Sequence, residues 1–274
     1  MLLKLLLLVG FISVSFQGIS QGKDVVRFAP LPLKPREELV ASYLPLVNLL
    51  ERKLGVKFEI LYVKNYEELF SKIAKGEVDI MTTGPLGYYT HLIKKGHNHV
   101  HPVVFIKESD GETFYKCVLV TMESGPKTVR ELKGPIALPQ KLSTCGYFSL
   151  SIILSKHKRN VKDFKYTFFD THNQAFESVL SGEYQAAVGK ESVAKKYIKG
   201  FPMRVIEESP DWPAFVLLAN SRTLKGNFIE RLKSTLTSLS LEELKTLSEG
   251  RYGFAPARKE DFEVIKNYES HLPK

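Results

Sequence analysis

The chain has 274 residues, with 39 Lys and Arg against 30 Asp and Glu, and a formal net charge of +9. The lysines are spread along the whole chain, and no basic block is interleaved with aromatic residues. The charge therefore predicts a mildly basic solvated surface and excludes nucleic acid from the expected partners.

Residues 1–20 have the form of a secretory signal peptide. Lys4 precedes an apolar run from Leu5 to Phe16, and small residues follow from Gly18 to Ser20. A run this short, with these flanks, is typical of a segment removed on export and not of a membrane span. We therefore expect an exported, soluble chain of roughly 250 residues, enough for one large or two medium domains.

Segments typical of strands alternate with segments typical of helices along the rest of the chain. We expect strands over residues 25–29, 56–63, 78–81, 100–107, 114–121, 135–138, 166–169, 184–188, 203–206 and 215–219. We expect helices over residues 37–54, 66–75, 129–133, 143–157, 227–239, 241–248 and 259–268, and further helices that begin near residues 85, 172 and 191. This alternation predicts α/β layers around a mainly parallel sheet.

One α/β unit occurs twice in the sequence. Residues 70–80 (FSKIAKGEVDI) resemble residues 176–186 (FESVLSGEYQA). Each copy reads as a helix, a Gly-Glu turn and a strand, followed by a glycine-containing loop and another helix. Chance similarity between such units is the alternative explanation, but the repeat favours two similar lobes.

Polar residues stand at the ends of four predicted strands. These residues are Thr82 and Thr83, Ser143 and Thr144, Thr171 and His172, and the segment 189–191. In open α/β sheets, ligands bind beyond the carboxyl ends of the strands. Two facing lobes would therefore bring the four groups to one cleft.

The segment 143–147 (STCGY) is the strongest candidate for a ligand loop. It follows the short strand 135–138 and opens the helix expected over residues 143–157. The first N–H groups of a helix lack intrahelical partners and favour anions, and Ser143 and Thr144 add hydroxyl donors. As the plainer alternative, Ser143 is only an N-cap. The four polar strand ends favour the ligand loop.

No pattern in the sequence indicates a metal or another cofactor. His97, His99 and His101 alternate, but a turn that enters a strand explains them, and no nearby Cys or carboxylate completes a zinc site. The chain has two cysteines, Cys117 in an apolar strand and Cys145 at a helix start. Export would permit a disulfide between them, but nothing in the sequence requires them to meet, so we do not expect a bridge.

Short motifs along the chain resemble one known family in their order and spacing. They lie at residues 43–46, 54–56, 65–66, 76–80, 83–86, 132–134, 143–146, 172, 182 and 253–257. Together they are similar to the phosphonate/phosphate-type periplasmic solute-binding proteins of ABC importers. The resemblance implies a two-lobed α/β fold of the type II periplasmic binding class, with the ligand cleft between the lobes and a two-strand hinge. Lobe one would comprise residues 24–115 and 215–274, and lobe two residues 116–214.

The resemblance also implies roles for individual residues. The family's phosphoryl-binding loop, two binding tyrosines and helix-initial histidine match Ser143, Thr144, Cys145, Tyr66, Tyr115 and His172. Cys145 replaces the third hydroxyl of the loop. The carboxylates that hold an aminoalkyl group in some relatives align only loosely with Glu191 and Asp211.

The mechanism that this resemblance implies is reversible binding without catalysis. An oxyanion held by Ser143 and Thr144 on one lobe and by Tyr66 and Thr83 on the other would favour the closed form. The closed form, located in the periplasm, would dock on an ABC permease in the inner membrane. A sensor that presents its ligand to a membrane kinase is the alternative. A weaker alternative is a Cys-dependent enzyme with Cys145 as the nucleophile and His172 as its base.

Overall fold

The computed structural model describes residues 25–273, so the predicted signal peptide lies outside the described residues. The strands are β1 (Val25–Ala29), β2 (Lys57–Ile60), β3 (Ile80–Thr83), β4 (Val100–Ile106), β5 (Phe114–Tyr115), β6 (Cys117–Met122), β7 (Ile136–Leu138), β8 (Tyr166–Phe168), β9 (Ala186–Lys190), β10 (Met203–Glu208), β11 (Trp212–Pro213), β12 (Val216–Asn220) and β13 (Phe254–Pro256). The α-helices are α1 (Arg36–Leu54), α2 (Tyr66–Lys75), α3 (Pro85–Tyr88), α4 (Tyr147–Lys156), α5 (His172–Leu180), α6 (Glu191–Gly200), α7 (Gly226–Thr237) and α8 (Leu241–Lys245). The other helical segments are η1 (Tyr89–Ile93), η2 (Val129–Glu131), η3 (Val161–Asp163) and η4 (Lys259–His271).

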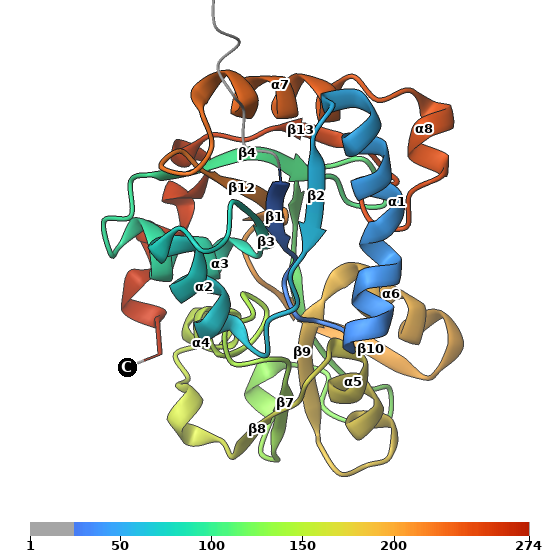
Figure 1. Ribbon diagram of the computed structural model, residues 1–274. Helices are drawn as coiled ribbons and strands as arrows, with labels where there is room; N and C mark the ends of the chain where they lie inside the picture. The colour runs from blue at the N-terminus through green and yellow to red at the C-terminus, as the bar shows by residue number, and fades with distance from the viewer. Residues whose placement is uncertain (1–24, 274) are drawn as a thin grey trace, which may run out of the picture.

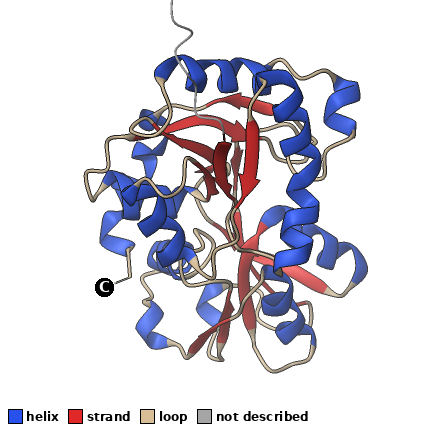
Figure 2. Cartoon of the chain, in the orientation of Figure 1, coloured by secondary structure: helices blue, strands red, loops and turns tan. Residues whose placement is uncertain are grey.

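The chain forms two α/β lobes, each built on its own sheet (Figure 1). The first lobe holds a six-stranded sheet in the order β13-β4-β12-β3-β1-β2, and the second a five-stranded sheet in the order β10-β6-β9-β7-β8. Helices pack around both sheets (Figure 2). The predicted two-lobed α/β fold is confirmed.

Both sheets are mixed, whereas the sequence predicted mainly parallel ones. In the first sheet β1 is parallel to β2 and β3, but β12 is antiparallel to β3 and β4. In the second sheet β7 is parallel to β8 and β9, but β6 is antiparallel to β9. Two of the antiparallel strands, β6 and β12, are those by which the chain enters the second lobe and returns to the first, and the third is the edge strand β13, antiparallel to β4. Local patterning does not show the direction of any of the three.

The two copies of the repeated sequence unit occupy equivalent places in the two lobes. The first copy forms α2 and β3, and the second forms α5 and β9. The order β2-β1-β3 in one sheet corresponds to β8-β7-β9 in the other. Gly76 and Gly182 both follow the helix with φ near +80° (78° and 79°), a backbone conformation that glycine adopts without strain.

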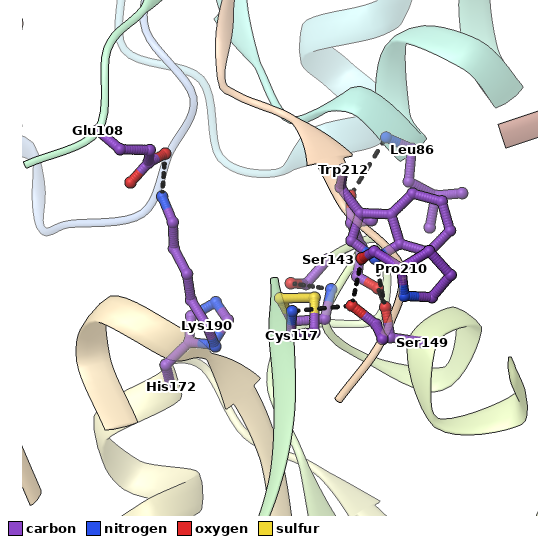
Figure 3. Close-up of a disulfide and its surroundings, with 12 residues drawn as sticks. Leu86, Glu108, Cys117, Ser143, Ser149, His172, Lys190, Pro210 and Trp212 are labelled. Atoms are coloured by element: carbon purple, nitrogen blue, oxygen red, sulfur yellow. Dashed lines mark hydrogen bonds and ion pairs between the residues drawn. A yellow bond between two sulfur atoms is a disulfide. The ribbon is translucent and has the colours of Figure 1, made fainter. Parts of the chain in front are cut away.

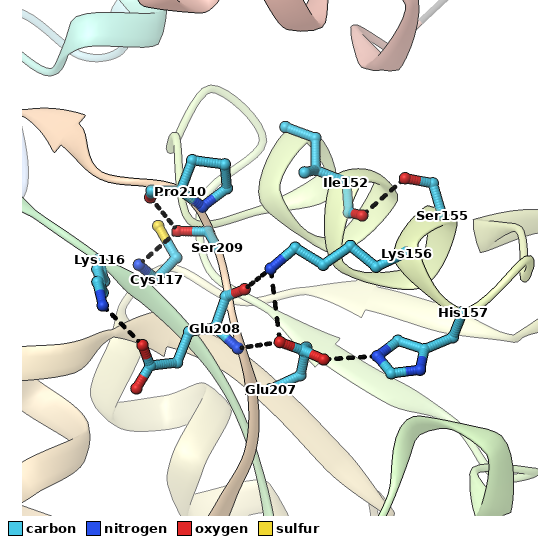
Figure 4. Close-up of polar contacts among 10 residues, drawn as sticks. All are labelled: Lys116, Cys117, Ile152, Ser155, Lys156, His157, Glu207, Glu208, Ser209 and Pro210. Atoms are coloured by element: carbon cyan, nitrogen blue, oxygen red, sulfur yellow. Dashed lines mark hydrogen bonds and ion pairs between the residues drawn. The ribbon is translucent and has the colours of Figure 1, made fainter.

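A short two-stranded ribbon joins the lobes. In this ribbon β5 pairs antiparallel with β11, so that Tyr115 lies opposite Trp212. Beside it, the Cys117 N–H donates to Ser209 Oγ over 2.9 Å, and Lys116 Nζ lies 2.8 Å from Glu208 Oε2 (Figure 4). These contacts hold the outgoing and returning segments side by side, as a two-strand hinge requires.

The C-terminal segment η4 contacts both lobes. Phe262 packs against Tyr88 of the first lobe, with 4.8 Å between the ring centroids. Ile265 belongs to a hydrophobic cluster that joins Phe148 and its neighbours in the second lobe to Leu86 and Tyr89 of the first. In the part of the chain that the structure describes, no helix is long and apolar enough to span a membrane.

Candidate functional site

A cavity of about 30 Å³ lies between the lobes, beside the hinge. Its lining residues are Leu31, Leu33, Tyr66, Gly84, Tyr115, Gln140, Leu142, Ser143, Thr144, Cys145, His172, Lys190 and Phe215. Six residues that the sequence predicted for the site are therefore brought together. A cavity of this volume has room for only a small ligand.

Besides the short helix α3, which Gly84 precedes, four longer helices begin at this cavity. Tyr66 and His172 are the first residues of α2 and α5, Lys190 directly precedes α6, and the loop of residues 139–146 leads into α4. The first N–H groups of a helix carry partial positive charge. Their convergence favours an anion in the cavity.

Local sequence explains why α2 and α5 begin where they do. Asn65 Oδ1 accepts the Glu68 N–H over 2.9 Å. Thr171 Oγ1 accepts the Gln174 N–H over 3.1 Å, and Gln174 Oε1 accepts the Thr171 N–H over 3.0 Å. These N-caps fix the first helical residues, which are the two that line the cavity.

The loop before α4 differs from the sequence prediction, because the helix begins at Tyr147 and not at Ser143. The Ser143 N–H donates to the Gln140 carbonyl over 2.8 Å, and the Gly146 N–H donates to the Ser143 carbonyl over 3.0 Å. Residues 140–146 therefore form turns, and Gly146 is the N-cap residue. Ser143 does not cap the helix: its Oγ accepts the Cys145 N–H within the loop over 3.3 Å, and the residue lines the cavity.

Thr144 connects the two lobes and the hinge. Its Oγ1 accepts the Leu86 N–H of α3 over 3.2 Å, and the Tyr115 hydroxyl also forms a hydrogen bond with it. Its carbonyl accepts from Ser149 Oγ over 2.6 Å, and Ser149 Oγ accepts from Trp212 Nε1 over 3.0 Å (Figure 3). Trp212 is fully buried and serves the hinge, not the lining of this cavity.

Cys117 and Cys145 form a disulfide, so the expectation of unpaired cysteines was wrong (Figure 3). Because β6 runs antiparallel to β9, its first residue, Cys117, lies opposite Lys190, the last residue of β9. The neighbouring strand β7 is parallel to β9 and ends on the same side of the sheet. The loop after β7 therefore reaches Cys117, and the two Cα atoms lie 5.1 Å apart. Cys145 lines the cavity without a thiol, and a Cys-dependent enzyme would lack its nucleophile.

Tyr66 and Tyr115 are the hydroxyl-bearing residues that line the cavity from the first lobe and the hinge. Burial raises the pKa of both phenols above the ordinary value, because the phenolate would lose its solvation. Both hydroxyls therefore remain protonated at neutral pH and can donate to an anion.

His172 is held in one tautomer by the end of β9. The Lys190 N–H donates to His172 Nδ1 over 3.1 Å, so the neutral ring carries its proton on Nε2. Burial, together with the nearby charge of Lys190, lowers the pKa of His172 to about 4. The ring is therefore neutral at pH 7 and offers one N–H donor.

Lys190 is a site residue that the sequence did not single out. Among the described residues lining the cavity it is the one charged side chain, and no carboxylate is present. Its Nζ lies 2.6 Å from Glu108 Oε1, and both side chains are largely buried. The only signal in the sequence was its place in the polar segment 189–191, at a predicted strand end.

Three predicted site residues do not line this cavity. Thr83 is fully buried, and its hydroxyl donates to the Gly84 carbonyl over 3.3 Å. Glu191 and Asp211 line a separate cavity beside the hinge, where Glu191 pairs with Lys195 over 2.8 Å.

The two sheets, the hinge and the interlobe cavity define a two-lobed protein with the type II periplasmic binding fold. Within this fold class, the sequence identifies the particular family. The sequence pattern of the ABC transporter phosphonate periplasmic substrate-binding proteins matches residues 28–263. The chain belongs to this family.

Solved structures support the same fold. PhnD1 from Prochlorococcus marinus (MIT 9301), in complex with methylphosphonate, has a TM-score of 0.75 at 18% identity, over 91% of this chain and 98% of that one. A binding protein component of an ABC phosphonate transporter from Pseudomonas aeruginosa has a TM-score of 0.73 at 15% identity, over 89% of this chain and 85% of that one.

A curated relative matches a shorter stretch. The phosphate-import protein PhnD of Mycolicibacterium smegmatis is 31% identical over 65 residues, which are 24% of this chain. The match spans 20% of that protein's length.

Proposed function

We propose that the protein is the periplasmic substrate-binding component of an ABC transporter, and that it binds a phosphonate- or phosphate-like oxyanion between its lobes. The observation that carries this proposal is the interlobe cavity, whose described lining residues supply hydroxyl and N–H donors and one cation, with no carboxylate among them. Such donors stabilise an anion without a full counter-charge, and the helix starts add to the effect. Membership of the family gives independent support.

The proposed ligand contacts come from both lobes. Ser143, Thr144 and His172 would donate from the second lobe, and Tyr66 from the first, with Tyr115 at the hinge. A ligand that bridges these groups stabilises the closed form over the open one. Closure would join lobe one, residues 24–115 and 215–274, to lobe two, residues 116–214, and the closed form would deliver the ligand to a membrane permease. Residues 1–20 would direct export to the periplasm.

Isothermal titration of the purified protein, freed of ligand by dialysis, tests this proposal. We expect saturable binding of at least one of phosphate, phosphite, methylphosphonate and aminoethylphosphonate, and weaker binding of acetate. Tyr62→Phe, a change of an exposed tyrosine outside the cavity, should bind as the wild type does. Absence of binding to all four phosphorus anions would sink the proposal.

A further inference from the structure

A second and larger cavity adjoins the first. Its volume is about 400 Å³, and it also lies between the lobes. The two cavities share the lining residues Leu31, Leu33, Lys190 and Phe215. These four side chains therefore separate a small space, lined by anion-binding groups, from a space more than ten times larger.

Lys190 is the part of this partition that comes from the second lobe. Its Nζ lies 4.5 Å from the ring centroid of Tyr115 and 5.2 Å from that of Phe215. It also pairs with Glu108 of the first lobe, and the two side chains are only 16% and 12% exposed. Figure 3 shows the Lys190 side chain extended away from His172 toward Glu108.

Several interactions hold this side chain in place. An ammonium group over two aromatic rings is attracted by both, and more strongly where water is excluded. If Lys190 moved away, Glu108 would be left as a largely buried carboxylate without its charged partner, which is unfavourable. The Lys190 side chain is therefore a fixed part of this boundary and not a freely moving surface lysine.

We infer that Lys190, held by Glu108, sets the upper size of the ligand. The side chain closes the phosphoryl-binding cavity on the side of the 400 Å³ cavity. The ligand class is then a phosphoryl anion with no substituent or a very small one, such as phosphate, phosphite or methylphosphonate. This inference rests on the proposed function, because it assumes that the small cavity receives the phosphoryl group.

The test compares dissociation constants for methylphosphonate, n-butylphosphonate and phenylphosphonate in three proteins. The wild type should bind methylphosphonate far more tightly than the two larger compounds. Lys190→Ala should connect the cavities and reduce this preference by about tenfold or more, since burial of two methylene groups corresponds to that change. Lys190→Met is the matched control, because it keeps a long side chain without the charge. This variant should bind all three ligands more weakly, and its preference for methylphosphonate should stay within about threefold of that of the wild type.

Each outcome separates the inference from the function on which it rests. A wild type that binds none of these three phosphonates, and none of phosphate, phosphite and aminoethylphosphonate, contradicts the proposed function itself. A wild type that binds all three equally leaves that function standing and overturns the size limit, as does Lys190→Ala with an unchanged preference. If Lys190→Ala binds no ligand, Glu108→Ala provides the comparison, because its Lys190 is present but no longer held. An unchanged preference there also overturns the inference.

Discussion

The two lobes contribute to the cleft in different ways. The second lobe supplies Ser143, Thr144, His172 and Lys190, and the described residues hold one disulfide, which lies within that lobe. The first lobe supplies Tyr66 and a largely apolar wall, formed by Leu31, Leu33 and Phe215. The second lobe therefore resembles a preformed anion site, and the first resembles a cover that completes it. Substitutions in the two lobes should accordingly affect different properties.

The largest expected effect concerns the disulfide of the second lobe. The double variant Cys117→Ala/Cys145→Ala should lower the free energy of unfolding by about 3–4 kcal/mol, because a crosslink across 28 residues restricts the unfolded chain. Urea denaturation measures this change. A reducing agent should destabilise the wild type and leave the double variant unaffected. Equal midpoints for the two proteins would show that the crosslink does not set the stability of the second lobe.

The next effect is a pH dependence that originates at His172. Its pKa of about 4 in the folded protein is below the ordinary 6.5, so between these values the unfolded chain binds a proton that the folded chain does not. Stability should therefore fall as the pH drops from 6.5 to 4, by at most about 3 kcal/mol. The variant His172→Asn keeps an acceptor for the Lys190 N–H in its Oδ1, and it should lose less stability than the wild type over this pH range. Urea denaturation at each pH measures the stability of both proteins. If the wild type and the variant lose the same stability between pH 6.5 and 4, the pH dependence does not originate at His172.

Thr144→Val tests whether closure depends on the second-lobe loop. The substitution removes a proposed ligand contact and leaves the buried Leu86 N–H of the first lobe without its acceptor. An unsatisfied buried donor is unfavourable by about 1–3 kcal/mol. Methylphosphonate should therefore bind about 100-fold more weakly, as measured by titration. Thr128→Val is the matched control, since Thr128 bonds to Glu131 elsewhere in the lobe. Equal loss in both variants would contradict a specific role of Thr144.

The smallest effect is expected from the covering lobe. Tyr66→Phe removes one hydroxyl donor and keeps the ring, so the affinity for methylphosphonate should fall about five- to tenfold, which corresponds to one net hydrogen bond. Thermal stability should stay close to that of the wild type. A loss as large as that of Thr144→Val would mean that both lobes contribute equally to the anion site, and the distinction between site and cover would fail.

Much of the fold follows from local sequence signals. The helix periodicity over residues 37–54 matches α1, and the repeated unit matches α2–β3 and α5–β9. The positions after strand ends, Ser143, Thr144 and His172, indeed meet at one cavity. These features were accessible because strand-to-helix transitions are encoded by neighbouring residues: caps, glycines and apolar spacing.

Other features depend on contacts between distant segments. The disulfide forms because β6 runs antiparallel to β9, which brings Cys117 to the end of the sheet where the loop after β7 passes. The partition by Lys190 depends on Glu108, 82 residues away in the chain and in the other lobe. Neither relation has a local signal.

The sequence by itself thus determined the α/β class, the internal repeat and the candidate anion-binding loop, because each of these is written in short-range patterns. The tertiary structure alone decided the pairing of the cysteines, the placement of Glu191 and Asp211 outside the interlobe cavity, and the position of Lys190 at its boundary. The physical reason is that strand direction and lobe closure set which distant side chains meet, and both arise from packing across the whole chain.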